Sequence, residues 1–255
     1  MTGPLTGKTA LVTGASRGIG RGIAERLAAD GALVVVHYAR NVAAAEHVVD
    51  SIRSRGGNAF GVQTELGASG DAEALYAAVD TALALRDMGP ELDILVNNAA
   101  VSGSARIHEV TPELVDKIFS VNVKSLLFVI QQALTRMRDG GRIINVSSAV
   151  TRIAYPESVV YSMSKGAMDT LTIALAKELG PRRINVNTVS PGFVATDMNA
   201  KLRTTPDGAA RLAGMSVFER IGDPSDVASV VAFLASPDSQ WITGQRLEAS
   251  GGTHL

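Results

Sequence analysis

Short apolar runs alternate with longer amphipathic stretches along the chain. The apolar runs are nearly continuous in Val, Ile and Leu, a pattern typical of strands buried on both faces of a parallel sheet. They predict strands at residues 9–13, 33–37, 59–62, 94–96, 142–146, 184–189 and 246–248. The amphipathic stretches predict helices at residues 20–30, 42–55, 71–86, 112–138, 161–179 and 224–235.

Start and stop signals support several of these helices. Thr111 and Asp223 each stand before a proline, which places a capping side chain ahead of a Pro at the first helical position. Glycines stand at or just beyond several of the predicted ends, at positions 31, 56, 140 and 180. The repeated alternation of strand and helix predicts a single doubly wound α/β domain over residues 1–255.

One region, residues 197–220, lacks a clear pattern. It follows the sixth predicted strand and mixes polar with apolar side chains. Ligands of an open α/β sheet bind beyond the carboxyl ends of the strands, where this region begins. Two interpretations stay open: a lid over a substrate, or an ordinary surface helix and loop.

Composition narrows the class of protein. The chain has 255 residues, 24 Lys+Arg against 25 Asp+Glu, no Cys and only 4% aromatic residues. A disulfide scaffold and a thiolate nucleophile are therefore excluded, and balanced charge argues against nucleic-acid binding. No apolar run approaches the roughly 20 residues of a membrane span, and no signal-peptide pattern is present, so we expect a cytoplasmic protein. His37, His47, His108 and His254 are scattered without carboxylates at ligand spacing, which predicts no metal site.

Residues 13–20 carry the strongest local signal, Thr-Gly-Ala-Ser-Arg-Gly-Ile-Gly, between the first strand and the first helix. Gly14 permits a tight turn, Gly18 lets the backbone approach a pyrophosphate, and Gly20 lets the helix pack close to the sheet. The helix N-terminus offers free N–H groups to phosphates. In this context the glycines predict a dinucleotide site rather than a tight connection alone.

The end of the second strand indicates which dinucleotide binds. A site for a free ribose 2′-hydroxyl places an acidic residue about 20 residues beyond the loop. Residues 37–41 contain no carboxylate, whereas Arg17 and Arg40 are suited to bind a 2′-phosphate. The sequence therefore favours NADP(H) over NAD(H), although both arginines also suit a solvated surface.

Tyr161 and Lys165 lie four residues apart at the start of a predicted helix, so they share one helical face. A nearby ammonium stabilises a phenolate and lowers the pKa of the phenol, which makes Tyr161 a usable general acid or base. Ser148 follows the fifth strand, where its hydroxyl is placed to bond a substrate carbonyl. Ser162 and Lys165 also match the S-x-x-K of serine acyl-enzymes, but the partner motifs of that class are missing.

Together these residues resemble the ordered motif series of the short-chain dehydrogenase/reductases. The series comprises residues 14–20, Asn97-Asn98-Ala99, Asn122, Ser148, Tyr161, Lys165 and Pro191-Gly192, and it covers residues 8–252. Within that family the chain is similar to 3-oxoacyl-carrier-protein reductases and related NADPH-dependent ketoreductases. The resemblance implies one Rossmann-like domain with a seven-stranded parallel sheet, commonly assembled as a homotetramer.

The resemblance also implies a role for each site residue. Tyr161 transfers the proton, Ser148 positions the carbonyl, and Lys165 holds the nicotinamide ribose and lowers the pKa of Tyr161. Asn122 anchors a water that links Lys165 to solvent, and it also marks a helix irregularity. The implied cofactor-binding residues are Gly14, Ser16, Arg17, Gly18, Ile19, Gly20, Tyr38, Arg40, Glu65, Leu66, Asn98, Ala99, Tyr161, Lys165, Pro191, Gly192, Val194 and Thr196. Three positions depart from the family pattern: Glu65 and Ser250 replace Asp, and Ala100 replaces Gly.

The function expected is NADP(H)-dependent transfer of a hydride between nicotinamide and a carbonyl or alcohol. A 3-oxoacyl thioester or similar ketone is the leading substrate, and a sugar, polyol or other secondary alcohol is the alternative. A non-catalytic NADP(H)-sensing protein is more distant, because such proteins typically lose the Tyr or the Lys. Arg136, Arg138 and Arg142 form either a docking patch for an acidic carrier or a solvated helix end. Apolar faces on helices 112–138 and 161–179 favour a homo-oligomer.

Overall fold

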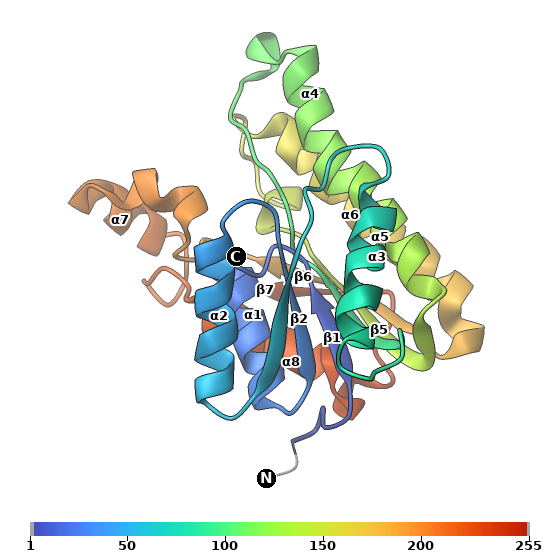
Figure 1. Ribbon diagram of the computed structural model, residues 1–255. Helices are drawn as coiled ribbons and strands as arrows, with labels where there is room; N and C mark the ends of the chain where they lie inside the picture. The colour runs from blue at the N-terminus through green and yellow to red at the C-terminus, as the bar shows by residue number, and fades with distance from the viewer. Residues whose placement is uncertain (1–2, 254–255) are drawn as a thin grey trace.

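A parallel sheet in the order β3-β2-β1-β4-β5-β6-β7 forms the centre of the computed structural model, which describes residues 3–253 (Figure 1). Each neighbouring pair of strands is parallel. The strands are β1 (Thr9–Val12), β2 (Leu33–Tyr38), β3 (Asn58–Gln63), β4 (Leu92–Asn97), β5 (Met137–Val146), β6 (Asn185–Pro191) and β7 (Arg246–Ala249). The seven-stranded doubly wound fold is thereby confirmed, and its order reverses between β1 and β4, where such folds bind ligands.

Helices cover both faces of this sheet. They are α1 (Gly18–Ala29), α2 (Val42–Ser54), α3 (Asp71–Ala84), α4 (Pro112–Phe119), α5 (Leu126–Leu134), α6 (Val159–Leu179), α7 (Pro206–Ala213) and α8 (Pro224–Ala235). One core lies under α1, α2 and α8, and a second lies under α3, α5 and α6. Along β2, Val34 and Val36 enter the first core and Val35 enters the second. This alternation explains why the strand is apolar on both faces.

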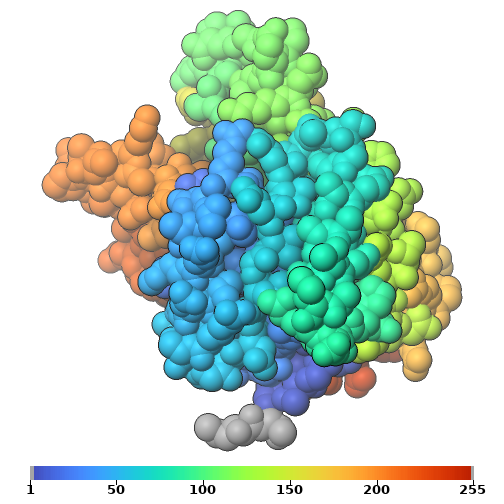
Figure 2. Space-filling view, viewed as in Figure 1, coloured from blue at the N-terminus to red at the C-terminus, as the bar shows by residue number. Residues whose placement is uncertain are grey.

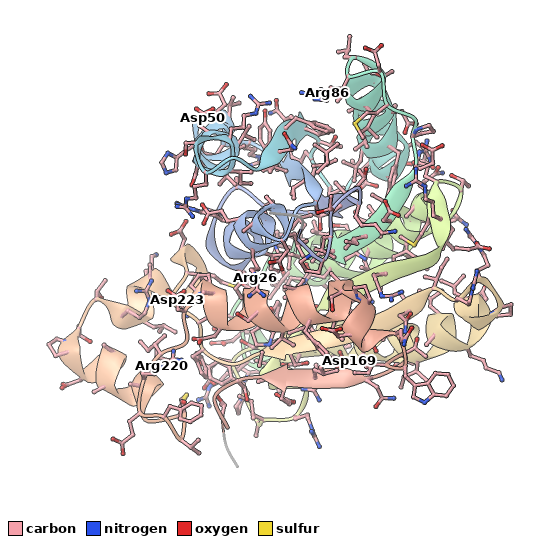
Figure 3. All side chains as sticks on the ribbon, turned by 90° about the horizontal axis from the view of Figure 1, so that it is seen from below. Arg26, Asp50, Arg86, Asp169, Arg220 and Asp223 are labelled. Carbon is pink, nitrogen blue, oxygen red and sulfur yellow. The ribbon has the colours of Figure 1, made fainter. Side chains whose placement is uncertain are left out.

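Helix α8 packs against α1 although the two are distant in sequence. Arg26 of α1 donates a hydrogen bond to Ser229 of α8 at 3.2 Å, and Figure 3 shows Arg26 beside that helix. The expected N-caps are present, since Thr111 accepts the Leu114 N–H and Asp223 accepts the Ser225 N–H. These caps hold the starts of α4 and α8 at the positions that the sequence predicts.

The predicted helix at residues 112–138 is wrong at its end. It includes a π-helical turn, Ser120–Ser125, and it ends at Leu134. The chain then enters β5, where Met137 pairs with Leu92 and is buried. The apolar Met137 fits the helical period as well as the strand, so only pairing with a strand distant in sequence decides the boundary.

Residues 197–220 contain a 3₁₀ helix, Asp197–Arg203, followed by α7. No bounds were predicted for a helix in this region, although Thr205-Pro206-Asp207 repeats the kind of start signal found at Thr111, and Thr205 accepts the Gly208 N–H. The segments around α4 and α7 project from the main body of the molecule (Figure 2). Among residues 3–253, no helix has the length and apolar character to cross a membrane.

Candidate active site

The loop between β1 and α1 is closely packed where the glycines stand. Gly14 and Gly18 have φ angles of 63° and 54°, in a region that residues other than glycine rarely adopt. A Cβ on Gly20 would lie 2.3 Å from the Gly14 carbonyl oxygen and 2.5 Å from Nδ2 of Asn98. Arg17 caps α1 without a side-chain hydrogen bond, so no capping side chain takes up the first N–H groups of the helix. This backbone cradle fits the pyrophosphate of a dinucleotide.

The end of β4 holds the loop in place. Thr13 Oγ1 accepts the backbone N–H groups of Asn98 and Ala99, both at 3.0 Å. In return, Nδ2 of Asn98 donates to the carbonyl oxygens of Thr13 and Gly14 at 2.9 and 3.0 Å. The structure thus joins Gly14, Asn98 and Ala99, as expected of cofactor-binding residues. Thr13 is a positioning residue that the sequence analysis left out, and its signal was a polar side chain at the end of a buried strand.

Both arginines assigned to a 2′-phosphate stand near the loop, and each pairs with a carboxylate. Arg40 forms an ion pair with Glu65, and the pair raises the pKa of Arg40 and lowers that of Glu65. Arg17 Nη1 lies 3.4 Å from Asp197 Oδ2. All four side chains are exposed, so a phosphate can compete for the guanidinium groups.

The remaining predicted cofactor residues surround the same edge of the sheet. Pro191 ends β6, Val194 packs into the first core, and Tyr38 packs at the end of β2. Thr196 faces the loop between β1 and α1, called the phosphate loop below, since a Cβ on Gly18 would lie 3.1 Å from the Thr196 methyl group. The others are half-buried: Ile19 lies in the first turn of α1, and the remaining residues lie in loops, namely Ser16, Leu66 and Gly192.

Ser148, Tyr161 and Lys165 converge at the carboxyl end of β5. Ser148 caps a 3₁₀ helix, Ala149–Thr151, where its hydroxyl accepts the Val150 N–H at 3.3 Å, and the same hydroxyl is near enough to lower the pKa of Tyr161. Tyr161 and Lys165 occupy the first turns of α6, with Lys165 Nζ 5.8 Å from the centre of the Tyr161 ring. Lys165 is fully buried and donates to the Val146 carbonyl oxygen at 2.7 Å.

Burial dominates the electrostatics of this set. It raises the pKa of Tyr161 to about 12, and the nearby Ser148 hydroxyl only partly opposes this effect. Burial also lowers the pKa of Lys165 to about 8, while the carboxylate of Asp169 raises it. The ammonium of Lys165 points at the Val146 carbonyl oxygen, and its predicted lowering of the pKa of Tyr161 stays a prediction.

Asn122 lies in the π-helical turn between α4 and α5, which confirms the expected helix irregularity. Its side chain exchanges two hydrogen bonds with the backbone of Val101, both at 2.9 Å. It also donates to Ser164 Oγ at 3.0 Å, and Ser164 donates to the Tyr161 carbonyl oxygen at 2.7 Å. Asn122 thereby ties the π-helical turn to the start of α6, while its predicted role in holding a water stays a prediction.

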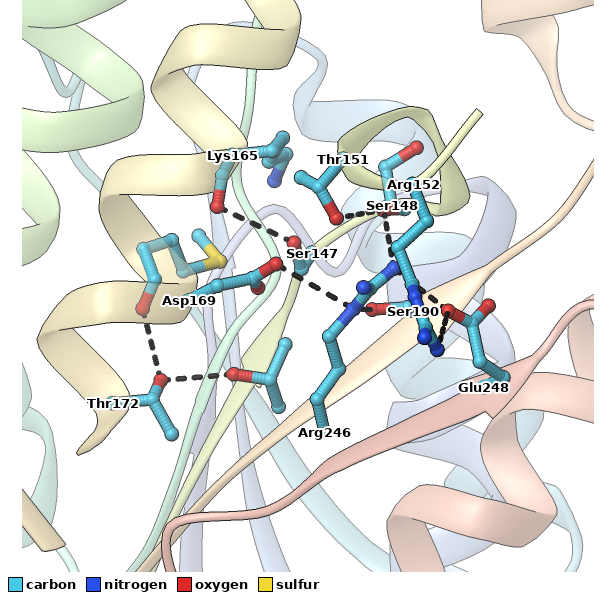
Figure 4. A network of polar contacts seen from close by, with 12 residues as sticks. Ser147, Ser148, Thr151, Arg152, Lys165, Asp169, Thr172, Ser190, Arg246 and Glu248 are labelled. Atoms are coloured by element: carbon cyan, nitrogen blue, oxygen red, sulfur yellow. Dashed lines mark hydrogen bonds and ion pairs between the residues drawn. The ribbon is translucent and has the colours of Figure 1, made fainter. Parts of the chain in front are cut away.

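A charged network behind the site was not predicted (Figure 4). Arg246 of β7 donates to Ser190 Oγ at 2.7 Å and pairs with Glu248 at 2.7 Å. It also lies 3.5 Å from Asp169 of α6 and donates to the Ser148 carbonyl oxygen at 3.4 Å. No spacing rule connects an edge strand with a helix so far away in sequence, so this network required the structure.

The arginines considered as a docking patch are already engaged. Arg136 pairs with Asp80 at 2.6 Å and is only 19% exposed, and Arg138 lies 3.4 Å from Asp93. Arg142 donates to the carbonyl oxygens of Gly140 and Gly141. They gather at the amino-terminal part of β5, away from Ser148, which favours a structural role for all three.

The histidines that the structure describes lie on separate elements. His37 is buried in β2, whereas His47 and His108 are exposed, and His254 lies outside the described residues. Within residues 3–253 there is no cluster of three His, Asp or Glu side chains suited to a metal ion.

Comparison with known proteins adds independent information. A family model described as enoyl-(acyl carrier protein) reductase matches residues 14–254. The chain is 46% identical over 249 residues to an uncharacterised oxidoreductase of Methylorubrum extorquens, covering 97% of this chain and 98% of the relative. It is 40% identical over 259 residues to versicolorin reductase of Emericella nidulans, covering 97% and 96%. It is 39% identical over 261 residues to a probable tetrahydroxynaphthalene reductase of Zymoseptoria tritici, covering 98% and 96%.

Solved structures agree with these sequence relatives. The angucycline C-6 ketoreductase LanV with bound NADP has a TM-score of 0.95 and 50% identity, covering 99% of this chain and 98% of that one. LanV with NADP and rabelomycin has a TM-score of 0.91 at the same identity and coverage. The fold described above is thus similar to that of reductases that bind NADP.

Proposed function

The chain belongs to the short-chain dehydrogenase/reductase family as an NADP-dependent ketoreductase, and we propose that it reduces a ring ketone of a hydroxylated fused-ring compound. The observation that carries this proposal is a pair of aromatic rings. Tyr155 precedes α6 and Phe193 follows β6, with ring centroids 6.2 Å apart and planes inclined by 52°. Both are half-buried, and aromatic faces of this kind pack well on flat rings.

The relatives support the same substrate class. Their names include a tetrahydroxynaphthalene reductase, a versicolorin reductase and an angucycline ketoreductase, and naphthalene is a pair of fused aromatic rings. The lid proposed over residues 197–220 adds exposed apolar side chains, Met198, Leu202 and Phe218. Such a surface suits a broad apolar substrate better than a sugar or polyol.

The chain's residues supply binding and proton transfer. NADPH, when bound, supplies the hydride that adds to the carbonyl carbon. Ser148 donates a hydrogen bond to the carbonyl oxygen, and Tyr161 gives its phenolic proton to that oxygen as it gains negative charge. Lys165 binds the hydroxyl groups of the nicotinamide ribose, and Asn122 maintains the proton supply toward Lys165. The product is an alcohol, since one hydride and one proton have been added.

Cofactor binding is assigned to the predicted set around the carboxyl edge of the sheet. The N–H groups at the start of α1 bind the pyrophosphate, as the close-packed glycine cradle favours. Arg17 and Arg40 exchange their present carboxylate partners for the 2′-phosphate, which bears more negative charge than a carboxylate. Glu65 remains beside the adenine, at the position of the family's Asp.

We further propose that the protein self-associates, as a dimer or tetramer, in the cytoplasm. Leu127 of α5 and Ile173 of α6 are 45% and 64% exposed, which is unusual for apolar side chains on neighbouring helices. Light scattering on the wild type and on Ile173→Lys tests this. A larger mass for the wild type alone supports the assembly, and a monomeric wild type contradicts it.

The substrate proposal is tested by following NADPH oxidation with fused-ring ketones and a 3-oxoacyl thioester, and NADP+ reduction with a polyol. We expect turnover with a tetralone or a hydroxynaphthalenone, and Tyr155→Leu and Phe193→Leu should raise the KM for that ketone. A 3-oxoacyl thioester, which the description of the family model favours, is the second candidate. Preferred turnover of the thioester, or of a polyol in the oxidative direction, contradicts a fused-ring substrate. Binding of NADPH without any turnover would point to a cofactor-sensing protein.

A further inference from the structure

His37, at the end of β2, is a buried histidine that the catalytic set does not use. Its side chain is only 2% exposed. Nδ1 accepts the backbone N–H of Gly14 at 3.1 Å, and Nε2 lies 2.8 Å from the carbonyl oxygen of Thr64. The backbone carbonyl of His37 also accepts the N–H of Ala15 at 2.8 Å. One residue therefore binds two consecutive N–H groups of the phosphate loop and the segment after β3.

These contacts define the protonation state of the imidazole. The Gly14 N–H can only donate and the Thr64 carbonyl can only accept, so Nδ1 carries the lone pair and Nε2 carries the proton. An imidazolium would direct a second N–H at the N–H of Gly14. Burial disfavours the charged form as well and lowers the pKa of His37 to about 4. The ring is thus neutral, with a single tautomer, over the physiological range.

We propose that His37 is a positioning residue for NADP(H), holding the phosphate loop in register with the segment that receives the adenosine end of the cofactor. The loop has little freedom to move at this point, because a Cβ on Gly14 would already lie 2.9 Å from the Cα of Ala99. Thr64 directly precedes Glu65, which pairs with Arg40. The imidazole therefore couples the pyrophosphate end of the site to the 2′-phosphate end.

His37 also directs which loop N–H groups remain for the phosphates. The N–H groups of Gly14 and Ala15 are consumed by His37, so anion binding is left to the groups at the start of α1. Loss of the imidazole acceptor would leave the Gly14 N–H without its partner. The peptide at Gly14 would then tend to reorient to find another acceptor. The loop between β1 and α1 would no longer be preorganised for the pyrophosphate.

A series of substitutions separates positioning from simple core filling. His37→Leu retains apolar volume but has no acceptor, whereas His37→Asn places an amide oxygen near the position of Nδ1. His47→Leu is the matched control, because His47 is exposed on α2. We expect His37→Leu to weaken NADP+ binding about tenfold, the usual effect of leaving one buried N–H unpaired. His37→Asn should recover most of that loss, kcat should change less than about twofold, and His47→Leu should bind like the wild type.

The pH dependence of NADP+ affinity gives a readout that core filling would not move. Gly14 and Thr64 meet the ring with backbone groups, and the charged residues on the adjoining segments, Arg40 and Glu65, pair with each other. We expect wild-type affinity to fall faster than that of His37→Asn as the pH drops below about 5. Both proteins experience the same titration of the cofactor phosphate, so the difference isolates the imidazole.

If the variants do not fold, nitrogen NMR of the His37 ring in the wild type tests the proposal. A His37 ring that stays in the Nε2–H tautomer down to pH 5, with Nδ1 accepting a hydrogen bond, supports the proposal. Titration near 6.5, or equal NADP+ affinity in wild type and His37→Leu, overturns it. The NADP+ binding and NMR measurements need no ketone, so they stand apart from the test of the proposed substrate.

Discussion

Gly20→Ala is the substitution with the clearest structural consequence in the cofactor site. The new Cβ would lie 2.3 Å from the Gly14 carbonyl oxygen and 2.5 Å from Nδ2 of Asn98, both well inside ordinary contact. Neither neighbour can yield cheaply, because one is backbone and the other donates hydrogen bonds to Thr13 and Gly14. Asn98 must rotate away or the loop must shift, and either movement disturbs the cradle for the pyrophosphate.

Three contributions determine how much Gly20→Ala changes the free energy of unfolding. Overpacking of this kind costs about 1–3 kcal/mol. Breaking the hydrogen bonds of a partly buried amide adds about 1–2 kcal/mol. Alanine in a helical position returns about 1 kcal/mol relative to glycine. We therefore expect Gly20→Ala to lower the free energy of unfolding by about 1–4 kcal/mol and to weaken NADPH binding by at least about tenfold.

Gly166→Ala is the matched control. Gly166 also lies inside a helix, α6, but a Cβ on this residue would meet nothing within 4 Å outside the backbone of its own helix. Urea unfolding and NADPH fluorescence titration should show Gly166→Ala equal to or slightly more stable than the wild type, with unchanged affinity. If Gly20→Ala behaves like Gly166→Ala in both measurements, the predicted clash at Gly20 is refuted.

Three further predictions concern the catalytic and cofactor residues. Tyr161→Phe should reduce turnover by at least about a thousandfold, with NADPH affinity within about twofold of the wild type; retained turnover would show that another group supplies the proton. Arg40→Gln should raise the KM for NADPH about tenfold relative to NADH by removing a cation from the 2′-phosphate, and an unchanged ratio would refute that assignment. Asp169→Asn should lower the pKa of Lys165, because the carboxylate now raises it. The alkaline limb of the kcat/KM profile should therefore move to lower pH, and an unmoved limb would exclude that coupling.

Local chemistry in the sequence predicted much of the fold. The strand at residues 33–37 was visible because both faces are buried, and α8 was visible because Asp223 and Pro224 form a start signal that needs no distant partner. The phosphate loop was predictable for the same reason. Gly14 and Gly18 shape this loop through their positive φ angles, which residues other than glycine rarely adopt.

Features that depend on residues distant in sequence were not predictable. The helix at residues 112–138 was extended too far because the period of apolar residues does not reveal that Met137 pairs with Leu92. The pairing of Arg136 with Asp80 likewise favours a structural role for an arginine that the sequence alone left open. His37 was one of four scattered histidines until the fold brought it between Gly14 and Thr64.

For Tyr161 and Lys165, the spacing in the sequence predicts their placement but not their burial. Spacing predicts that Tyr161 and Lys165 share a helical face, and the structure confirms this, but spacing does not reveal how deeply either is buried. Burial places the pKa of Tyr161 at about 12, so the phenol holds its proton at neutral pH. A protonated tyrosine is the form needed to give a proton to a carbonyl oxygen, whereas alcohol oxidation needs the phenolate. An ordinary phenol with a pKa of about 10 is protonated at neutral pH as well, so the effect of desolvation is to disfavour the phenolate that alcohol oxidation requires.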